Sequence, residues 1–179
     1  MKVVHAGPGT YCPAHLGHVN IAERVAKTVG KVIMVCSVNN GKEQPWFTPE
    51  ECKAMWQTYD LGENIIVMTF DEFMAQHTAD ETIVMVRGIR DEKDLEFEKG
   101  ILEQNRRDYG IEQYHYVIAE ERFKKFSSTK ARKLAMKGNF KKLARMTNPT
   151  IAALMIAKAK QIRRNRFSRS GFCCRLVNW

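Results

Sequence analysis

The sequence predicts an α/β fold of the Rossmann-like class: a doubly wound, parallel, five-stranded sheet with helices on both faces, followed by C-terminal helices. Five short apolar runs rich in Val and Ile alternate along the chain with longer helical stretches, a pattern typical of parallel sheets. The chain has 179 residues, 44% of them hydrophobic, which suffices for one domain with one core. In such a sheet, ligands bind beyond the carboxyl ends of the strands, where the strand order reverses.

The strands are predicted from the apolar runs. The first run surrounds Val3-Val4 and leads into a Gly-rich turn, after which an amphipathic stretch over 19–26 predicts a helix. The other four predicted strands are Lys31–Val38, Ile65–Met68, Thr82–Val86 and Tyr114–Ile118.

The helices are predicted from their start signals and their lengths. Thr48 is typical of an N-cap, with Pro49 at the first helical position and Glu51 completing a capping box. Further helices are expected over about 91–109, 128–137 and 148–161. We expect residues 163–179 to form a basic tail, which leaves residues 1–162 as the domain.

The charge is divided unevenly along the chain. Residues 1–121 carry 12 basic and 20 acidic side chains, whereas residues 122–179 carry 17 basic and no acidic ones, for a net charge of +9. A tract of this kind indicates nucleic-acid contact, or a solvated helical face that also binds the phosphates of a small ligand. Over 122–145 we favour the small ligand, and over 163–179 both interpretations stay open.

The cysteines indicate a reducing compartment. There are five, an odd number, and none forms a C-x-x-C pair. No long apolar run is present, so we expect a cytoplasmic protein with neither a leader nor a membrane span.

The turn after the first strand is the best candidate for a functional site. It reads Gly9-Thr10-Tyr11-Cys12-Pro13 and is followed by His15-Leu16-Gly17-His18 at the helix start. Outward backbone N–H groups and a helix N-terminus favour a polyphosphate, and two imidazoles three residues apart share a helix face. Two surface histidines on a βα turn are the plainer alternative. A zinc site on Cys12, His15 and His18 is disfavoured because no fourth ligand lies nearby in the sequence.

Three segments carry a resemblance to a known family. The turn resembles the G-T-F-D-P…H-x-G-H signature of the nucleotidyltransferase superfamily. The stretch Arg87-Gly88-Ile89-Arg90-Asp91-Glu92-Lys93-Asp94-Leu95-Glu96-Phe97-Glu98 is similar to the R-G-[LI]-R-x-x-x-D-[FL]-E-[YF]-E segment of phosphopantetheine adenylyltransferases. The segment Phe126-Ser127-Ser128-Thr129-Lys130-Ala131-Arg132 is similar to the I-S-S-[ST] segment of the same enzymes. The resemblance runs in order from residue 3 to about 160.

The resemblance implies a nucleotidyltransferase domain over 1–162 that makes dephospho-coenzyme A and pyrophosphate from ATP and 4′-phosphopantetheine, a step of coenzyme A biosynthesis. It also implies Mg²⁺ bound with the ATP, and a homohexamer. The implied catalytic residues are Thr10, His18, Lys42 and Arg90. The implied nucleotide contacts are Gly9, Thr10, Tyr11, His18, Gly88, Ile89, Arg90, Glu98, Phe123, Ser127, Ser128 and Thr129. The implied acceptor contacts are Thr10, Lys42, Met74 and Arg87.

The charged residues in this set also have plainer interpretations. Lys42 reads equally as a solvated loop lysine. Arg87 and Arg90 can each bind a phosphate through two hydrogen bonds. They can also form ion pairs with Asp91, Asp94 or Glu98, and such ion pairs are compatible with phosphate binding. Glu98 itself reads either as a nucleotide contact or as an exposed carboxylate of an acidic helix.

The uncharged residues carry the same ambiguity. Met74 reads as a contact to the pantetheine arm or as core packing. Ser127-Ser128-Thr129 reads as a phosphate site at a helix start, which the order of the motifs favours, or as a simple N-cap.

Three departures from the family pattern leave other functions open. Cys12 stands where the family has Asp, Lys124-Lys125 stand where it has apolar or small residues, and His15 completes an H-x-G-H seen in other branches. The alternatives are adenylyl transfer to another acceptor, such as nicotinamide mononucleotide, and a nucleic-acid-binding protein on the same scaffold.

Overall fold

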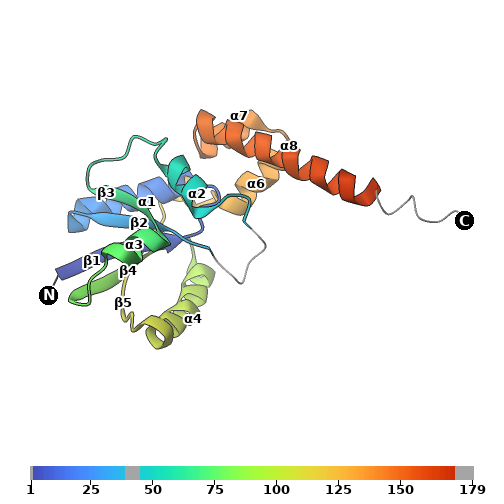
Figure 1. Cartoon of the computed structure of the whole chain (residues 1–179). Coiled ribbons are helices and arrows are strands. Elements are labelled where there is room, and N and C mark those ends of the chain that lie inside the picture. Colours follow the sequence, from blue (N-terminus) through green and yellow to red (C-terminus); the bar gives the residue numbers. More distant parts are fainter. Residues whose placement is uncertain (1, 39–44, 172–179) are drawn as a thin grey trace, which may run out of the picture.

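The computed structural model describes residues 2–38 and 45–171, and its centre is one parallel sheet (Figure 1). The strands run in the order β3-β2-β1-β4-β5, and every neighbouring pair is parallel. Their bounds are β1 (Lys2–Gly9), β2 (Val32–Cys36), β3 (Ile65–Thr69), β4 (Glu81–Ile89) and β5 (Gln113–Ile118). The predicted fold class, with five parallel strands, is confirmed.

The strand order reverses beside the central strand. After β1 the chain adds β2 and then β3 on one side, and it crosses over to add β4 and β5 on the other. The register pairs Gly9 with Cys36 and Ala6 with Met85, so the ends of β1 and β4 lie next to each other. The segments after Gly9 and after Ile89 therefore meet at the switch point, where doubly wound sheets bind ligands.

Helices cover both faces of this sheet. They are α1 (Leu16–Val29), α2 (Pro49–Trp56), α3 (Phe70–Gln76) and α4 (Glu92–Tyr109). On one face the larger core cluster joins α1 and α2 to Met34 and Val86. On the other face Phe73 of α3 packs with Ala6 and Val35. The alternation of these core residues along the strands is the two-residue period expected of a sheet buried on both sides.

The capping chemistry shows which helix starts could be predicted. The expected capping box of α2 is present: Thr48 Oγ1 accepts from Glu51 N at 3.2 Å, and Glu51 Oε2 accepts from Thr48 N at 2.8 Å. The same pair recurs at the start of α3, between Thr69 and Glu72. α3 was not among the helices predicted above, although its Thr-x-x-Glu signal is present in the sequence.

The C-terminal third forms a group of helices at one end of the sheet. They are α5 (Glu121–Lys124), α6 (Ser128–Met136), α7 (Phe140–Met146) and α8 (Pro149–Gly171). The helices α6, α7 and α8 pack on one another, and the end of α8 projects away from the body of the molecule (Figure 1). α5 and α7 were not expected as separate helices. The boundary expected at 162/163 falls inside α8, which continues to Gly171.

No helix in the described ranges has the length and apolar character needed to cross a membrane.

Candidate active site

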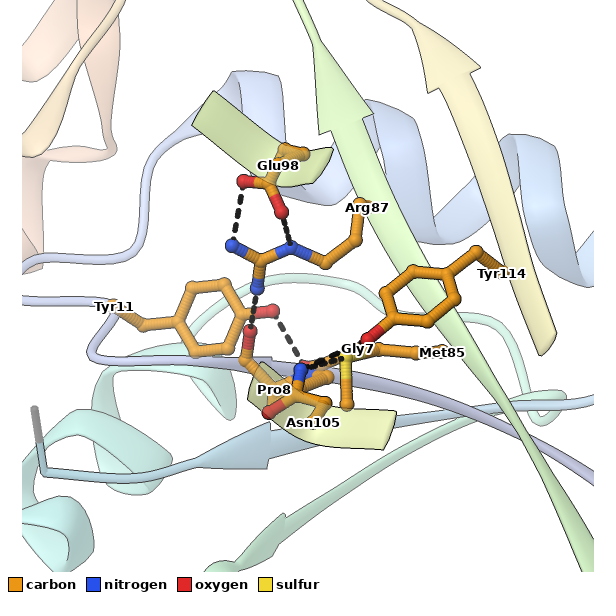
Figure 2. Close-up of polar contacts among 8 residues, drawn as sticks. All are labelled: Gly7, Pro8, Tyr11, Met85, Arg87, Glu98, Asn105 and Tyr114. Carbon is orange, nitrogen blue, oxygen red and sulfur yellow. Dashed lines mark hydrogen bonds and ion pairs between the residues drawn. The ribbon is translucent and has the colours of Figure 1, made fainter. Parts of the chain in front are cut away.

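The loop after β1 folds its aromatic side chain back under the strand. Tyr11 has a φ of +41°, and its ring is buried. Its hydroxyl donates to Gly7 O at 2.6 Å, as Figure 2 shows. A Cβ on Gly9 would lie 2.9 Å from the Tyr11 ring, so only glycine leaves room for this conformation. Tyr11, expected among the nucleotide contacts, is thus placed beneath the loop, while Thr10 beside it is half-buried.

The two histidines cap the first turn of α1 reciprocally. His15 is the N-cap, and its Nδ1 accepts from Gly17 N at 3.2 Å. In return, His18 Nδ1 accepts from His15 N at 3.2 Å. The two rings stack with centroids 3.7 Å apart, and Tyr11 meets the His18 ring edge-on at 4.9 Å. The H-x-G-H segment is therefore a capping box built from imidazoles.

These contacts determine the protonation of both rings. Burial, reinforced by the Arg90 guanidinium, lowers the pKa of His15 to about 3. Burial also lowers the pKa of His18 well below its usual range, with contributions from His15 and Arg90. Because each Nδ1 accepts a backbone N–H, the single proton of each neutral ring lies on Nε2. The start of α1 thus offers two neutral N–H donors.

The start of α6 is fastened to the same loop. Ser128 Oγ donates to Pro13 O at 2.9 Å, and Arg132 Nη1 donates to Cys12 O at 2.7 Å. The N-cap, Ser127, accepts from Lys130 N at 3.1 Å, and Thr129 Oγ1 accepts from Arg132 at 3.2 Å. Ser127 therefore is the N-cap of a helix that starts beside the loop, and a phosphate site on the Ser-Ser-Thr run stays a prediction. Arg132 was not predicted as a site residue, because its carbonyl partner lies 120 positions earlier.

Aromatic rings line the segment that leads into α6. Phe123 and Phe126 meet edge-to-face with centroids 5.6 Å apart, and both are half-buried. Phe126 also presents its edge to His15 at 6.3 Å. The predicted nucleotide contact Phe123 therefore belongs to the same cluster as the histidines.

Arg87 and Glu98 form a bidentate ion pair below the loop (Figure 2). Arg87 Nε donates to Glu98 Oε2 at 2.6 Å and Nη2 donates to Oε1 at 2.7 Å. Arg87 Nη1 donates to Pro8 O at 2.8 Å, so the guanidinium also ties β4 to β1. Glu98 is only 7% exposed, so it is not a solvated carboxylate of an acidic helix. Arg87 was interpreted above as a phosphate contact and as the partner of a nearby carboxylate, and the structure shows the second of these, the ion pair with Glu98.

Arg90, directly after β4, lies close enough to His15 and His18 for its charge to lower the pKa of both. Arg90 forms a second bidentate pair, with Asp94, at 2.6 and 2.8 Å. Its side chain keeps 44% of its surface exposed, so it is accessible to an anion. Gly88 is exposed and Ile89 is buried, with Ile89 O accepting from Ala119 N at 2.8 Å.

Cys12 lies buried at the base of the loop beside a second thiol. A hydrogen bond from the Cys52 side chain lowers the pKa of Cys12 to about 6, with help from backbone N–H groups of Phe47 and Trp46 and from the Arg132 guanidinium. The same bond and burial raise the pKa of Cys52. The cradle around Cys12 therefore favours an anion. Nothing in the sequence pointed to Cys52, which comes from α2.

Two predicted acceptor contacts remain, Met74 and Lys42. Met74 is on α3 and is 49% exposed, so it is not the core methionine that the alternative interpretation required. Lys42 lies outside the described residues.

Comparison with known proteins adds to this geometry. The model of the family described as cytidylyltransferase-like matches residues 7–134. The chain belongs to the cytidylyltransferase-like family. The matched range starts within β1 and ends within α6, so it contains the loop, both histidines and the Ser-Ser-Thr run.

Curated relatives of this family member are similar at moderate identity. A phosphopantetheine adenylyltransferase from Corynebacterium glutamicum is 27% identical over 133 residues, covering 73% of this chain and 82% of its own length. One from Cereibacter sphaeroides is 29% identical over 158 residues, covering 84% of this chain and 95% of its own length.

Solved structures support the fold. A putative nicotinate-nucleotide adenylyltransferase from Vibrio parahaemolyticus matches with a TM-score of 0.56 at 19% identity, covering 87% of this chain and 99% of its own. A bifunctional NMN adenylyltransferase/ADP-ribose pyrophosphatase from Francisella tularensis matches with a TM-score of 0.61 at 13% identity, covering 98% of this chain and 57% of its own. At these identities the likeness concerns the fold alone.

Proposed function

We propose that this protein transfers the adenylyl group of ATP to the phosphate of 4′-phosphopantetheine, giving dephospho-coenzyme A and pyrophosphate. The observation that carries the proposal is the pair of neutral imidazoles at the start of α1: each Nδ1 accepts a backbone N–H, so each Nε2 carries the proton. They lie at the switch point, with the start of α6 fastened to the same loop and Arg90 close to them.

The chemistry asks little covalent participation from the protein. A phosphate oxygen of the acceptor bonds to the α-phosphorus of ATP while the bond from that phosphorus to the bridging oxygen of the β-phosphate breaks. The nucleophile is already an anion, so no general base is needed, and positioning and charge stabilisation supply the rate. In the proposal His18 Nε2–H donates to an α-phosphate oxygen as negative charge develops there. Thr10 and Arg90 contact the same phosphates, and Ser127–Thr129 receive the β- and γ-phosphates at the start of α6.

The acceptor is proposed on two grounds. The curated relatives named above are phosphopantetheine adenylyltransferases, and the Arg87–Glu98 segment matches their pattern. Nicotinamide mononucleotide is the second candidate, because the solved structures named above are adenylyltransferases of pyridine mononucleotides and His15 completes an H-x-G-H.

Mg²⁺ enters this proposal with the nucleotide. Within residues 2–38 and 45–171 no three His, Cys, Asp or Glu side chains gather into a group that could bind a metal ion. We therefore propose that triphosphate oxygens carry the ion, which neutralises part of their charge.

Pyrophosphate release from ATP and Mg²⁺ tests the proposal, with 4′-phosphopantetheine and nicotinamide mononucleotide offered separately. We expect release with phosphopantetheine. Release only with nicotinamide mononucleotide would show that this compound, and not 4′-phosphopantetheine, is the acceptor. Release with neither would overturn the adenylyl-transfer proposal.

His18→Asn tests the role of the donor in the same assay. Asn offers an oxygen that accepts the His15 N–H, so the helix cap survives while the Nε2–H donor is lost. We expect turnover to fall about a hundredfold to a thousandfold, the usual cost of one transition-state donor. The matched control is His115→Ala, a histidine on the edge strand β5 whose ring meets that of His5, and its turnover should stay within about twofold. Full activity in His18→Asn would remove His18 from the mechanism.

A further inference from the structure

Residues 128–165 form a surface whose charge the proposed reaction does not use. We call this segment, which comprises α6, α7 and the first part of α8, the C-terminal helical unit. It contains eleven Lys and Arg residues and no Asp or Glu. Nine of these cations are exposed: Lys130, Lys133, Lys137, Lys141, Lys142, Arg145, Lys160, Arg163 and Arg164.

The exposed cations repeat at a spacing that destabilises helices. Three pairs of these cations lie four residues apart: Lys133 with Lys137, which is the C-cap of α6, Lys141 with Arg145 in α7, and Lys160 with Arg164 in α8. Like charges at this spacing face each other and cost about 0.2–0.5 kcal/mol per pair. Elsewhere several surface cations are paired with carboxylates, as Lys53 is with Glu72 and Lys99 with Glu96. Within the described ranges none of these nine exposed cations forms an ion pair with a carboxylate, so the fold alone does not account for the pattern.

The apolar sides of these helices are buried in the core of the protein. Leu143, Ile151 and Met155 are fully buried, and Ala131 and Ala159 are buried with them. The cations therefore lie on the outward sides of the packed helices. The exposed large apolar residues of the unit are Phe140 and Leu154, on different helices, so a lipid surface would find no continuous apolar face.

We propose that the C-terminal helical unit binds the phosphate backbone of a double-stranded nucleic acid without reading its sequence. Backbone binding requires only cations placed along the phosphates. Stacking of single-stranded bases requires a platform of exposed aromatic rings, and Phe140 is the single exposed aromatic side chain in this described unit. The part of α8 that belongs to the unit, residues 149–165, is 17 residues long and spans about 25 Å, the length of about seven phosphates along one strand.

The test is fluorescence anisotropy of labelled 20-base-pair duplexes, one of DNA and one of RNA with the same sequence, titrated with the full chain over a range of KCl concentrations. We expect the logarithm of the binding constant to fall linearly with the logarithm of the salt concentration, with a slope of about −4 to −7 for five to eight phosphate contacts. A preference for one duplex identifies the nucleic acid. No salt-dependent binding to either would overturn the proposal.

A charge-neutralising variant assigns the binding to this surface. The variant Lys133→Gln/Lys141→Gln/Lys160→Gln removes one cation from each pair, and we expect affinity to fall at least tenfold and the slope to shrink by about 2 to 3. The control, Lys27→Gln/Lys31→Gln/Lys93→Gln, removes the same charge from exposed lysines on other elements. Equal effects in both variants would mean that net charge alone is responsible.

Two further measurements distinguish duplex binding from binding to an anionic lipid surface and from the proposed enzymatic activity. Vesicles of phosphatidylcholine with phosphatidylglycerol should bind the chain more weakly than the duplexes, and stronger vesicle binding would overturn the choice of partner. The triple variant should keep its pyrophosphate release, because its changed residues touch none of the candidate active site. This inference does not rest on the proposed function, and either can fail without the other.

Discussion

At the scale of single residues, the chemistry of the candidate site is set by ring nitrogens. The Nδ1 atoms of His15 and His18 each accept a backbone N–H at the start of α1, so each ring must be neutral for the capping hydrogen bonds to form. Protonating either Nδ1 would remove an acceptor and place a cation beside Arg90. Structure and charge state are therefore coupled at this point of the chain.

The coupling predicts how stability depends on pH. In the unfolded chain a histidine binds a proton near pH 6.5, whereas His15 in the fold does so only near pH 3. The unfolded state binds more protons between these values, so stability is full above pH 6.5 and falls as the pH is lowered. We expect protonation of His15 in the unfolded chain to lower the free energy of unfolding by about 2 kcal/mol between pH 7.5 and pH 5.

Urea unfolding of the native chain and His15→Asn at both pH values measures this effect. Asn is a good N-cap and does not titrate, so the variant should lose less stability at pH 5 than the native chain does. An equal loss in both proteins would contradict the lowered pKa of His15.

A second residue-scale prediction concerns the cradle around Cys12. Since the hydrogen bond from Cys52 lowers the pKa of Cys12 to about 6, its thiolate should be the main form at pH 7.5. We expect the ultraviolet absorbance of thiolate to rise between pH 5 and 7. The step should vanish in Cys12→Ser and persist in Cys36→Ser, whose buried thiol has its pKa raised to about 12 by burial. A step that survives Cys12→Ser would assign the anion elsewhere.

At the scale of elements, the contact between α1 and β4 depends on a missing side chain. A Cβ on Gly88 would lie 2.2 Å from Ile21 Cδ1, so a side chain at this position would push the terminal methyl group of Ile21 out of its place. Gly88→Ala should therefore destabilise the fold by about 1–2 kcal/mol through overpacking.

Thermal unfolding of a double-mutant cycle tests this contact. Ile21→Val removes Cδ1, so Gly88→Ala should cost less in that background. Gly100→Ala is the control, since nothing lies within 4 Å of its Cβ position in α4, and it should stabilise the helix slightly. Additive effects at Gly88 and Ile21 would contradict the predicted clash.

Elements could be predicted from sequence where the signal was local. Apolar runs indicated all five strands, and Thr48 with Glu51 indicated the start of α2. α5 and α7, with 4 and 7 residues, are too short to show a helical period.

At the scale of the whole molecule, the outline of the site was predictable but its internal pairing was not. The loop, the histidines and the Ser-Ser-Thr run follow from motifs and from the reversal of strand order. The bonds from Ser128 to Pro13 and from Arg132 to Cys12 join residues 115 and 120 positions apart, and no local pattern encodes them. The same holds for Cys12 with Cys52 and for the burial of Tyr11.

Truncation tests which part of the chain the whole molecule requires. Ala159 is the last buried residue described in α8, so deleting 163–179 should change the melting temperature by less than about 2 °C. Deleting 148–179 removes the buried Ile151, Ala152 and Met155 and should unfold much of the domain. Circular dichroism melts measure both. A large loss from the shorter deletion would show that the domain does not end at 162.

The capping box of imidazoles also turns the start of α1 into a reporter. The amide hydrogen of His15 is hydrogen-bonded to the His18 ring, and that of Gly17 to the His15 ring. Each amide hydrogen can therefore exchange with heavy water only when this hydrogen bond is broken. Exchange rates at these two amides therefore give the fraction of time for which each imidazole is misaligned, and they do so in the resting protein, before any nucleotide is added.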